Sequence, residues 1–260
     1  MAAVAHARRE FGANLAACYA IGSLAHGGFA PLVSDVDLAI VLNDATAVDL
    51  WEGVARVVDG VEAEVDDLLA QRLSIFWSDW SGVRRGAAPG HRLPAIDRLD
   101  LLQSGRLLHG SDYRGPAVVP GRDELLTNSV EFALAKIDRT YCAELHDPAR
   151  LITEGVRVVT KRVLFPVRFL YTLDTSRIGR NEDAIDWYRG RHHRLVRAAG
   201  QWRYGGLDAT AEALLSDELI GLYIEFVDAY SGVVADRADL AQQLAVLRRR
   251  LVADSSSKST

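Results

Sequence analysis

The chain has 260 residues, of which 49% are hydrophobic and 25% charged, and its formal net charge at pH 7 is −5. This composition is typical of a globular protein with a sizeable core. No run of about 18 apolar residues is present, so no membrane-spanning helix is predicted, and the first residues lack the apolar segment of a secretory signal. The acidic balance argues against nucleic acid as a partner, because proteins that grip duplex DNA by its phosphates carry a basic excess. Two distant cysteines, Cys18 and Cys142, fit a reducing, cytoplasmic location.

The first third of the chain shows strand and helix patterns in alternation. Short apolar runs predict three strands, over residues 15–21, 37–42 and 73–77. Helical spacing of apolar residues predicts a helix over 47–58, with Asp44 or Thr46 as its N-cap. This order predicts a mixed sheet with helices on its faces.

The pattern then changes toward helices. Residues 81–94 are rich in Gly, Arg and Pro and predict a loop, residues 97–108 predict a helix ending near Gly110, and residues 115–121 contain two prolines and predict a linker. Beyond the linker only helical periodicity is found, and it predicts five helices, over residues 123–144, 148–173, 183–199, 210–230 and 234–252. The expected fold class is therefore α+β. A mixed-sheet domain over 1–114 precedes an all-α helical bundle over 121–252, and a polar tail over 253–260 is expected to be disordered.

One segment carries a chemical signature. Gly22-Ser23 ends the first predicted strand, Asp35-Val36-Asp37 opens the second, and eleven residues separate Ser23 from Asp35. Gly22 has no Cβ and lets the backbone approach a phosphate closely, while Ser23 opens a short helix whose free N–H groups suit an anion. Asp35 and Asp37 are two residues apart on a strand, so both carboxylates project from one face.

This pair of features predicts the ligand. Two convergent carboxylates favour a hard divalent cation such as Mg²⁺, and a cation beside an anion cradle predicts a nucleoside triphosphate whose phosphate charge the metal would neutralise. The sequence lacks both the G-x-x-x-x-G-K-[ST] and the G-x-G-x-x-G patterns. The nucleotide is therefore not expected to be held as in P-loop or Rossmann proteins.

The Gly-Ser, spacer, Asp-x-Asp arrangement resembles the signature of the nucleotidyltransferase superfamily of polymerase β-like folds. Residues 167–175 and 183–187 are in addition similar to the helical C-terminal domain of the aminoglycoside (3″)(9) adenylyltransferases. This resemblance implies that Gly22 and Ser23 bind phosphates and that Asp35 and Asp37 hold magnesium. It also implies that Arg168 faces the active site, and that Arg180 takes the phosphate contact made in that family by a lysine at the next position.

The resemblance leaves the general base open. The superfamily normally has a third carboxylate on a later strand, which in the antibiotic adenylyltransferases is often a glutamate that takes the proton from the acceptor hydroxyl. The aligned position here is Ser74, a poor base at neutral pH. Asp79 follows and is the first candidate for the base, although alternation places it on the opposite face unless a bulge turns it inward. Asp97 and Asp100 are the next candidates.

The sequence thus predicts a Mg²⁺-dependent nucleotidyltransferase that transfers a nucleoside monophosphate, AMP from ATP, to a hydroxyl of a small acceptor. An aminocyclitol or aminoglycoside antibiotic of the streptomycin or spectinomycin kind is the candidate acceptor, because such molecules are cationic. Two alternatives stay open. The acceptor could be a protein or the end of a tRNA, as in toxin-like nucleotidyltransferases, or the protein could be a regulatory module that binds nucleotide without transferring it, as Ser74 in the expected base position suggests.

Overall fold

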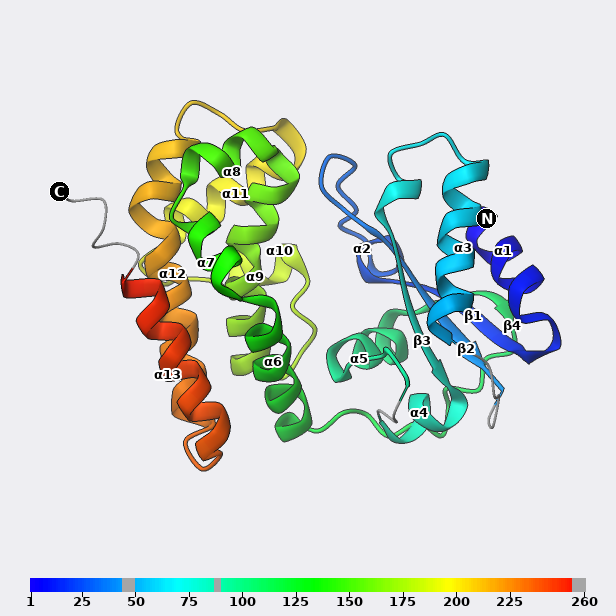
Figure 1. Ribbon diagram of the computed structural model, residues 1–260. Coiled ribbons are helices and arrows are strands. Elements are labelled where there is room, and N and C mark those ends of the chain that lie inside the picture. The colour runs from blue at the N-terminus through cyan, green and yellow to red at the C-terminus, as the bar shows by residue number, and fades with distance from the viewer. Residues whose placement is uncertain (44–49, 87–89, 254–260) are drawn as a thin grey trace. The chain divides into compact units, whose positions relative to one another are not determined.

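The computed structural model describes residues 1–43, 50–86 and 90–253 (Figure 1). The chain divides into two compact units. The first unit comprises Met1–Phe29 and Ser34–Gly121, and the second comprises the short segment Ala30–Val33 with the chain from Arg122 onward. The predicted helix caps Asp44 and Thr46 lie outside the described residues, and so does the predicted tail (253–260) apart from Ala253, which is the last residue of a helix.

The first unit is built on a mixed sheet of four strands. In chain order these are β1 (Leu15–Ile21), β2 (Val36–Leu42), β3 (Leu73–Asp79) and β4 (Arg106–Gly110). Across the sheet their order is β3-β2-β1-β4, with β2 parallel to β3 and β1 antiparallel to both of its neighbours. The predicted mixed sheet is confirmed, and β1 has the predicted bounds.

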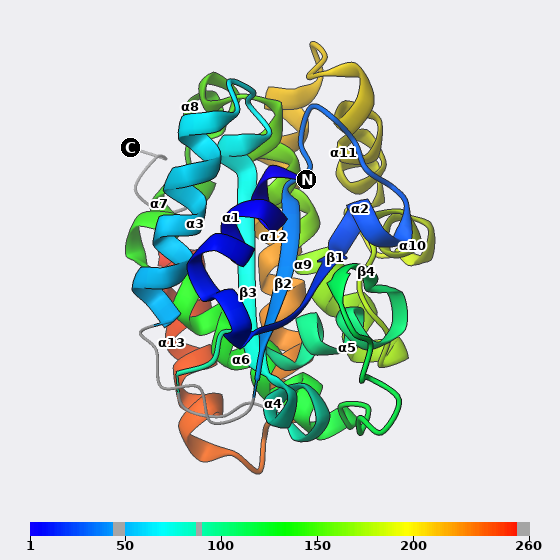
Figure 2. The same ribbon diagram turned by 90° about the vertical axis from the view of Figure 1, so that its right-hand side faces the viewer.

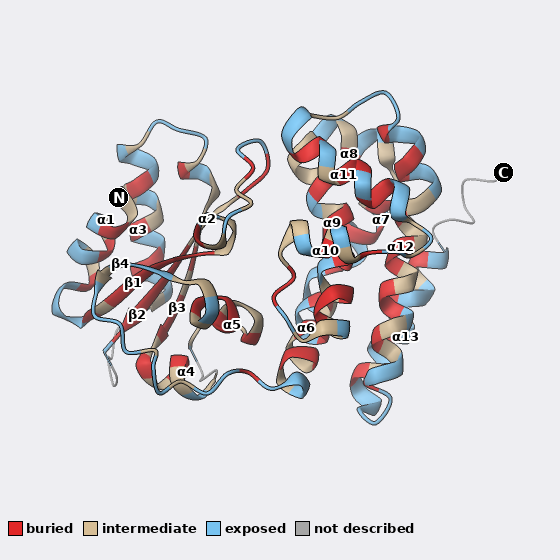
Figure 3. Ribbon diagram, turned by 180° about the vertical axis from the view of Figure 1, so that it is seen from behind, coloured by how far each residue is buried: buried red, intermediate tan, exposed pale blue. Residues whose placement is uncertain are grey.

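Alternation along β2 and β3 separates two cores, one on each face of the sheet. Helices cover both faces (Figures 1, 2 and 3). The helices α1 (Ala2–Phe11) and α3 (Leu50–Glu64) cover one face, where they bury Leu38 and Ile40 of β2. The short helix α4 (Trp80–Arg85) and α5 (Ala95–Ser104) cover the other, where Ala39 and Val41 are buried. Cys18 is fully buried on the α1/α3 face, and burial raises the pKa of its thiol to about 12, so it stays protonated.

Two predictions for this unit are wrong. The helix predicted over 97–108 ends at Ser104, because Gly105 turns the chain and donates its N–H to the carbonyls of Asp100 and Leu101. The residues that follow form the edge strand β4 instead of a last helical turn. The loop predicted over 81–94 contains most of α4, which Asp79 caps with its side chain.

The second unit is all-helical, as predicted, but its helices are shorter and more numerous. Within the residues described it contains α6 (Arg122–Lys136), α7 (Arg139–Leu145), α8 (Pro148–Glu154), α9 (Val156–Thr175), α10 (Asn181–Trp187), α11 (His193–Gly205), α12 (Ala211–Val233) and α13 (Ala238–Ala253). Local signals cause the additional breaks. Asp138 accepts a hydrogen bond from the N–H of Tyr141 and so begins a new helix, and Gly155, with φ +97°, ends α8 before α9.

Hydrogen bonds from tyrosines connect α9 and α12 within the core of this unit. Pro166, inside α9, has no N–H for the carbonyl of Arg162 one turn earlier. The hydroxyl of Tyr223 on α12 donates to that carbonyl at 2.8 Å, and the hydroxyl of Tyr230 donates in the same way to the carbonyl of Phe169 at 2.9 Å. Tyrosines of α12 therefore supply donors that the α9 backbone uses, and they fix the two helices against each other.

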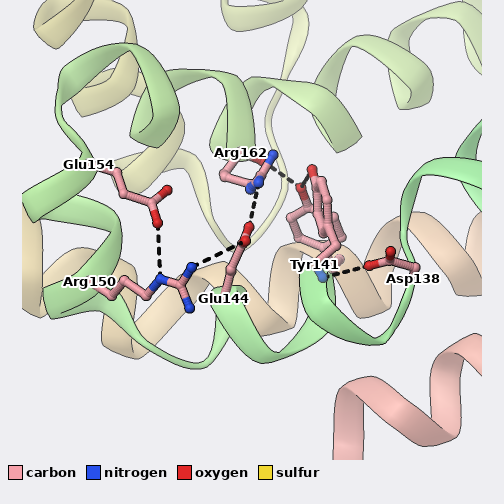
Figure 4. Close-up of polar contacts among 7 residues, drawn as sticks. Asp138, Tyr141, Glu144, Arg150, Glu154 and Arg162 are labelled. Atoms are coloured by element: carbon pink, nitrogen blue, oxygen red, sulfur yellow. Dashed lines mark hydrogen bonds and ion pairs between the residues drawn. The ribbon is translucent and has the colours of Figure 1, made fainter.

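A charged cluster joins α7, α8 and α9 (Figure 4). Arg162 lies over the ring of Tyr141, with its guanidinium carbon 3.9 Å from the ring centroid, and donates to Glu144 at 2.5 Å. Arg150 contacts both Glu144 and Glu154 from the other side. The guanidinium of Arg162 is thus held by a carboxylate and an aromatic face, a combination that compensates its partial burial. No helix among the residues described is long and apolar enough to cross a membrane.

The segment after β4 is fastened to the sheet by Asp112. Its carboxylate accepts two hydrogen bonds from the Arg114 guanidinium, at 2.9 and 2.7 Å, and one from the hydroxyl of Tyr19, at 3.0 Å. Arg114 in turn donates to the carbonyls of Leu101 and Gly105 on the C-terminal part of α5. The hydrogen bond from Arg114 is the main reason why the pKa of Asp112 falls to about 2.

This contact gives a pH-dependent stability. A depressed carboxylate pKa contributes stability that is present above the unfolded-state value, about 4, and is lost as the pH falls toward about 2. We expect Asp112→Asn to lower the free energy of unfolding at pH 7 by about 1 kcal/mol, since the pair is partly exposed. Urea unfolding followed by tryptophan fluorescence should show the difference from wild type shrinking as the pH is lowered from 4 toward 2. A difference of constant size over this window would contradict the assignment.

Candidate functional site

The predicted Gly-Ser turn and the predicted Asp-x-Asp pair meet at one end of the sheet. β1 ends at Ile21, Gly22 takes φ +65°, and the five-residue helix α2 (Gly22–His26) begins there. In the β1–β2 pairing Ile21 lies opposite Asp37. A Cβ on Gly22 would lie only 2.3 Å from Oδ2 of Asp37, so the Asp37 carboxylate packs directly against the glycine. Both the positive φ and the close approach require glycine at position 22.

Asp37 lies on the face of the sheet that α4 and α5 cover. It shares this face with Ala39 and Val41, and its neighbour on β3 is Ser74. Asp35 precedes β2 by one residue and is two residues from Asp37, so both stand at the same end of the strand. Ser23, Asp35 and Asp37 are all half-buried, as expected for groups that reach solvent at the end of a strand.

The carboxylates of Asp35 and Asp37 suit a metal ion that is bound to a nucleotide when it enters the site. Among the described residues no group of three or more His, Cys, Asp or Glu side chains could hold a metal ion. Asp35 and Asp37 offer two carboxylates, and Mg²⁺ is commonly bound by one or two carboxylates together with substrate phosphates and water. The donor set therefore suits a magnesium–nucleotide complex.

Asp79, the first candidate for the base, is not brought to this site. The register of β2 and β3 is regular, with Asp37 beside Ser74 and Leu42 beside Asp79. Asp79 is thus five residues further along the strand than Ser74, about 16 Å at the rise of a strand. Its carboxylate accepts a hydrogen bond from the N–H of Gly82 at 2.7 Å and caps α4. This placement corrects the ranking of the candidates, because no bulge turns Asp79 toward Asp35 and Asp37.

Asp100, the last of the candidates, is the carboxylate that reaches the site. It lies on α5, is 6% exposed, and its Oδ2 accepts a hydrogen bond of 2.6 Å from the N–H of Gly22. Asp97, one turn earlier, is half-buried in the first turn of the same helix. Helical periodicity does not tell which turn of α5 meets the Gly22 turn, so this contact of Asp100 is not predictable from the sequence.

The two predicted arginines belong to the helical unit. Arg168 on α9 is exposed, and its Nε donates to the carbonyl of Gly179 at 2.6 Å. Arg180 follows Gly179 directly and is the N-cap residue of α10. The contact with Gly179 therefore gathers both arginines at one place in this unit, beside Asn181. Their role in nucleotide binding stays a prediction.

Comparisons with known proteins add evidence on the fold. No family model matches the sequence, and no curated protein matches it. Among solved structures, the crystal structure of the spectinomycin adenyltransferase from Enterococcus faecialis, determined with ATP and spectinomycin, is similar over 96% of either chain. The sequence identity is 14% and the TM-score is 0.56. The similarity spans both units and confirms the predicted α+β fold and, at the level of the fold, the resemblance to the antibiotic adenylyltransferases.

Proposed function

We propose that the protein is a nucleotidyltransferase that moves a nucleoside monophosphate, AMP from ATP, to a hydroxyl of a small acceptor. The observation that carries the proposal is the packing of the Asp37 carboxylate against Gly22, which joins the glycine-serine turn to the Asp35/Asp37 pair. The fold adds support, because the similar adenyltransferase was determined with ATP. A cytoplasmic location, where ATP is present and the free thiols of Cys18 and Cys142 persist, is part of the proposal.

Different residues have different roles in the proposed reaction. Asp35 and Asp37 would hold Mg²⁺, which supplies neutralisation of the charge that develops on the phosphates. The Gly22-Ser23 turn would orient the phosphates through the start of α2 at Ser23, because the N–H of Gly22 donates to Asp100 and the place of its missing Cβ is taken by the Asp37 carboxylate. The acceptor oxygen then bonds to the α-phosphorus while the bond to pyrophosphate breaks. Ser74 beside Asp37 is not a base, so any carboxylate assistance comes from elsewhere than this position of β3.

For the acceptor we propose a cationic aminocyclitol or aminoglycoside. The support is the acidic net charge of −5 and the fold shared with an enzyme whose structure contains spectinomycin. Arg168 and Arg180 are proposed to contact the nucleotide phosphates, because they are neighbouring cations in the helical unit.

The test is pyrophosphate release from ATP and Mg²⁺, measured with streptomycin, with spectinomycin and without a drug, alongside the thermal shift caused by ATP. We expect a magnesium-dependent shift and release that requires one of the two drugs. If pyrophosphate is released with neither streptomycin nor spectinomycin, but ATP still causes the magnesium-dependent thermal shift, the proposed acceptor is contradicted and the nucleotide site stays supported. Absence of both the shift and the release would contradict the nucleotidyltransferase proposal itself.

One observation favours a second candidate function, a nucleotide-binding module without transfer. Ser74 stands beside Asp37 where a base was expected, and the register holds Asp79 at the other end of β3. In this case ATP would bind with Mg²⁺, and no pyrophosphate would appear with any acceptor, including protein and tRNA.

A further inference from the structure

The Asp100 carboxylate is buried with only part of its hydrogen-bonding capacity used. Its Oδ2 accepts from the N–H of Gly22, at a distance short enough for a charge-assisted hydrogen bond. Its Oδ1 is buried and has no hydrogen-bond partner in the part of the chain that the structure describes. A buried polar atom of this kind calls for an explanation, because most such atoms in native proteins are paired.

Holding Gly22 does not by itself require a charge at position 100. A neutral side-chain oxygen would accept the same N–H without a second, unpaired oxygen and without the cost of burying a carboxylate. The nearby arginines contact other groups: Arg98 donates to the carbonyl of Val118, and Arg114 pairs with Asp112. The buried negative charge therefore points to a positive partner that is not a side chain of this helix.

Gly22 connects this charge to the proposed magnesium site. The Asp100 carboxylate contacts the N–H of Gly22, and the Asp37 carboxylate packs against the position of its missing Cβ. The carboxylates of Asp37 and Asp100 thus both contact Gly22. A cation held by Asp35 and Asp37 would therefore lie within the electric field of the Asp100 carboxylate. In a partly buried site this attraction is stronger than in water.

We infer that Asp100 is a positioning residue of the nucleotide site, which holds the Gly22 turn and whose negative charge strengthens the binding of magnesium with the nucleotide. The inference rests on the proposed function. It assigns to Asp100 no direct bond to the metal, in agreement with the finding that no group of three metal-ligating side chains is gathered among the described residues.

The test separates charge from hydrogen bonding. Asp100→Asn keeps an acceptor for the Gly22 N–H and removes the charge, and Asp100→Ser removes the charge with a shorter side chain. The concentration of Mg²⁺ that gives half of the ATP-induced thermal shift is measured for each variant and for wild type. We expect it to rise about tenfold in both variants, as for loss of one nearby charge. Glu62→Gln, which removes an exposed negative charge from α3 on the other face of the sheet, is the matched control and should titrate like wild type.

A purely structural role would lower the melting temperature of the ligand-free variants and leave the Mg²⁺ requirement unchanged, and this result would overturn the inference. The Ser variant provides the measurement if the Asn variant does not fold. A wild type that shows no magnesium-dependent shift would overturn the proposed function and this inference with it. If wild type shows the magnesium-dependent shift and the Asn and Ser variants need the same Mg²⁺ concentration as wild type, the inference alone is overturned.

Discussion

Asp37→Asn is expected to slow pyrophosphate release by about a hundred- to a thousandfold, the size of effect seen when one preorganised electrostatic contact to a reacting group is removed. The carboxylate of Asp37 lies on the sheet face of the site and packs against Gly22, so its charge is placed where magnesium and phosphates are proposed to bind. The change is nearly isosteric and removes repulsion among carboxylates. The melting temperature should therefore stay at or slightly above that of wild type, which a thermal unfolding scan will show.

Asp79→Asn is the matched control, because it makes the same change on the neighbouring strand at the other end of the sheet. Asp79 caps α4 through the N–H of Gly82, and because Asn caps a helix about as well as Asp, the stability should change little. Turnover should be unaffected. An equal loss of turnover in the two variants would contradict the conclusion that Asp37 lies in the active site and Asp79 lies outside it.

The part of the site that could be predicted from the sequence is the part encoded locally. Gly22-Ser23 and Asp35-x-Asp37 each follow from a single strand end and from alternation along one strand, and their meeting follows from the pairing of two consecutive strands. The position of Ser74 beside Asp37 could also be predicted from the sequence, because the parallel register of β2 and β3 has no irregularity.

The contact between Asp100 and Gly22 could not be predicted from the sequence, because it spans 78 residues. Which turn of α5 meets Gly22 depends on how the helix packs on the sheet, and helical periodicity does not contain that information. The edge strand β4 was missed for a related reason. Most of its residues are exposed, so it lacks the alternation of a half-buried strand, and pairing with β1 decides its conformation.

In the helical unit the sequence predicted helical character correctly and helix ends poorly. Apolar periodicity continues across Asp138 and across Gly155, so it does not mark the breaks there. The breaks come from short-range cap chemistry, a side-chain acceptor in one case and a positive φ in the other. Cap signals therefore deserve more weight than periodicity where the two disagree.

Gly22→Ala is expected to lower turnover by about a hundredfold, because it displaces the carboxylate that the site depends on. The new Cβ would lie 2.3 Å from Oδ2, 3.1 Å from Cγ and 3.3 Å from Cβ of Asp37, so the whole side chain must move. The positive φ adds about 1–2 kcal/mol of backbone strain. Turnover in the pyrophosphate assay and the free energy of unfolding in urea measure the two effects separately.

Gly12→Ala separates backbone strain from collision. Gly12 also has a positive φ, +52°, but a Cβ there would meet nothing within 4 Å. It follows α1, so its replacement should reduce stability by a similar 1–2 kcal/mol through strain and leave turnover unchanged. The difference in turnover between the two alanine variants then measures what the displacement of Asp37 costs. If Gly22→Ala turned over ATP as fast as Gly12→Ala, the contact between Asp37 and Gly22 would have no part in the reaction, and the central observation behind the proposed function would fail.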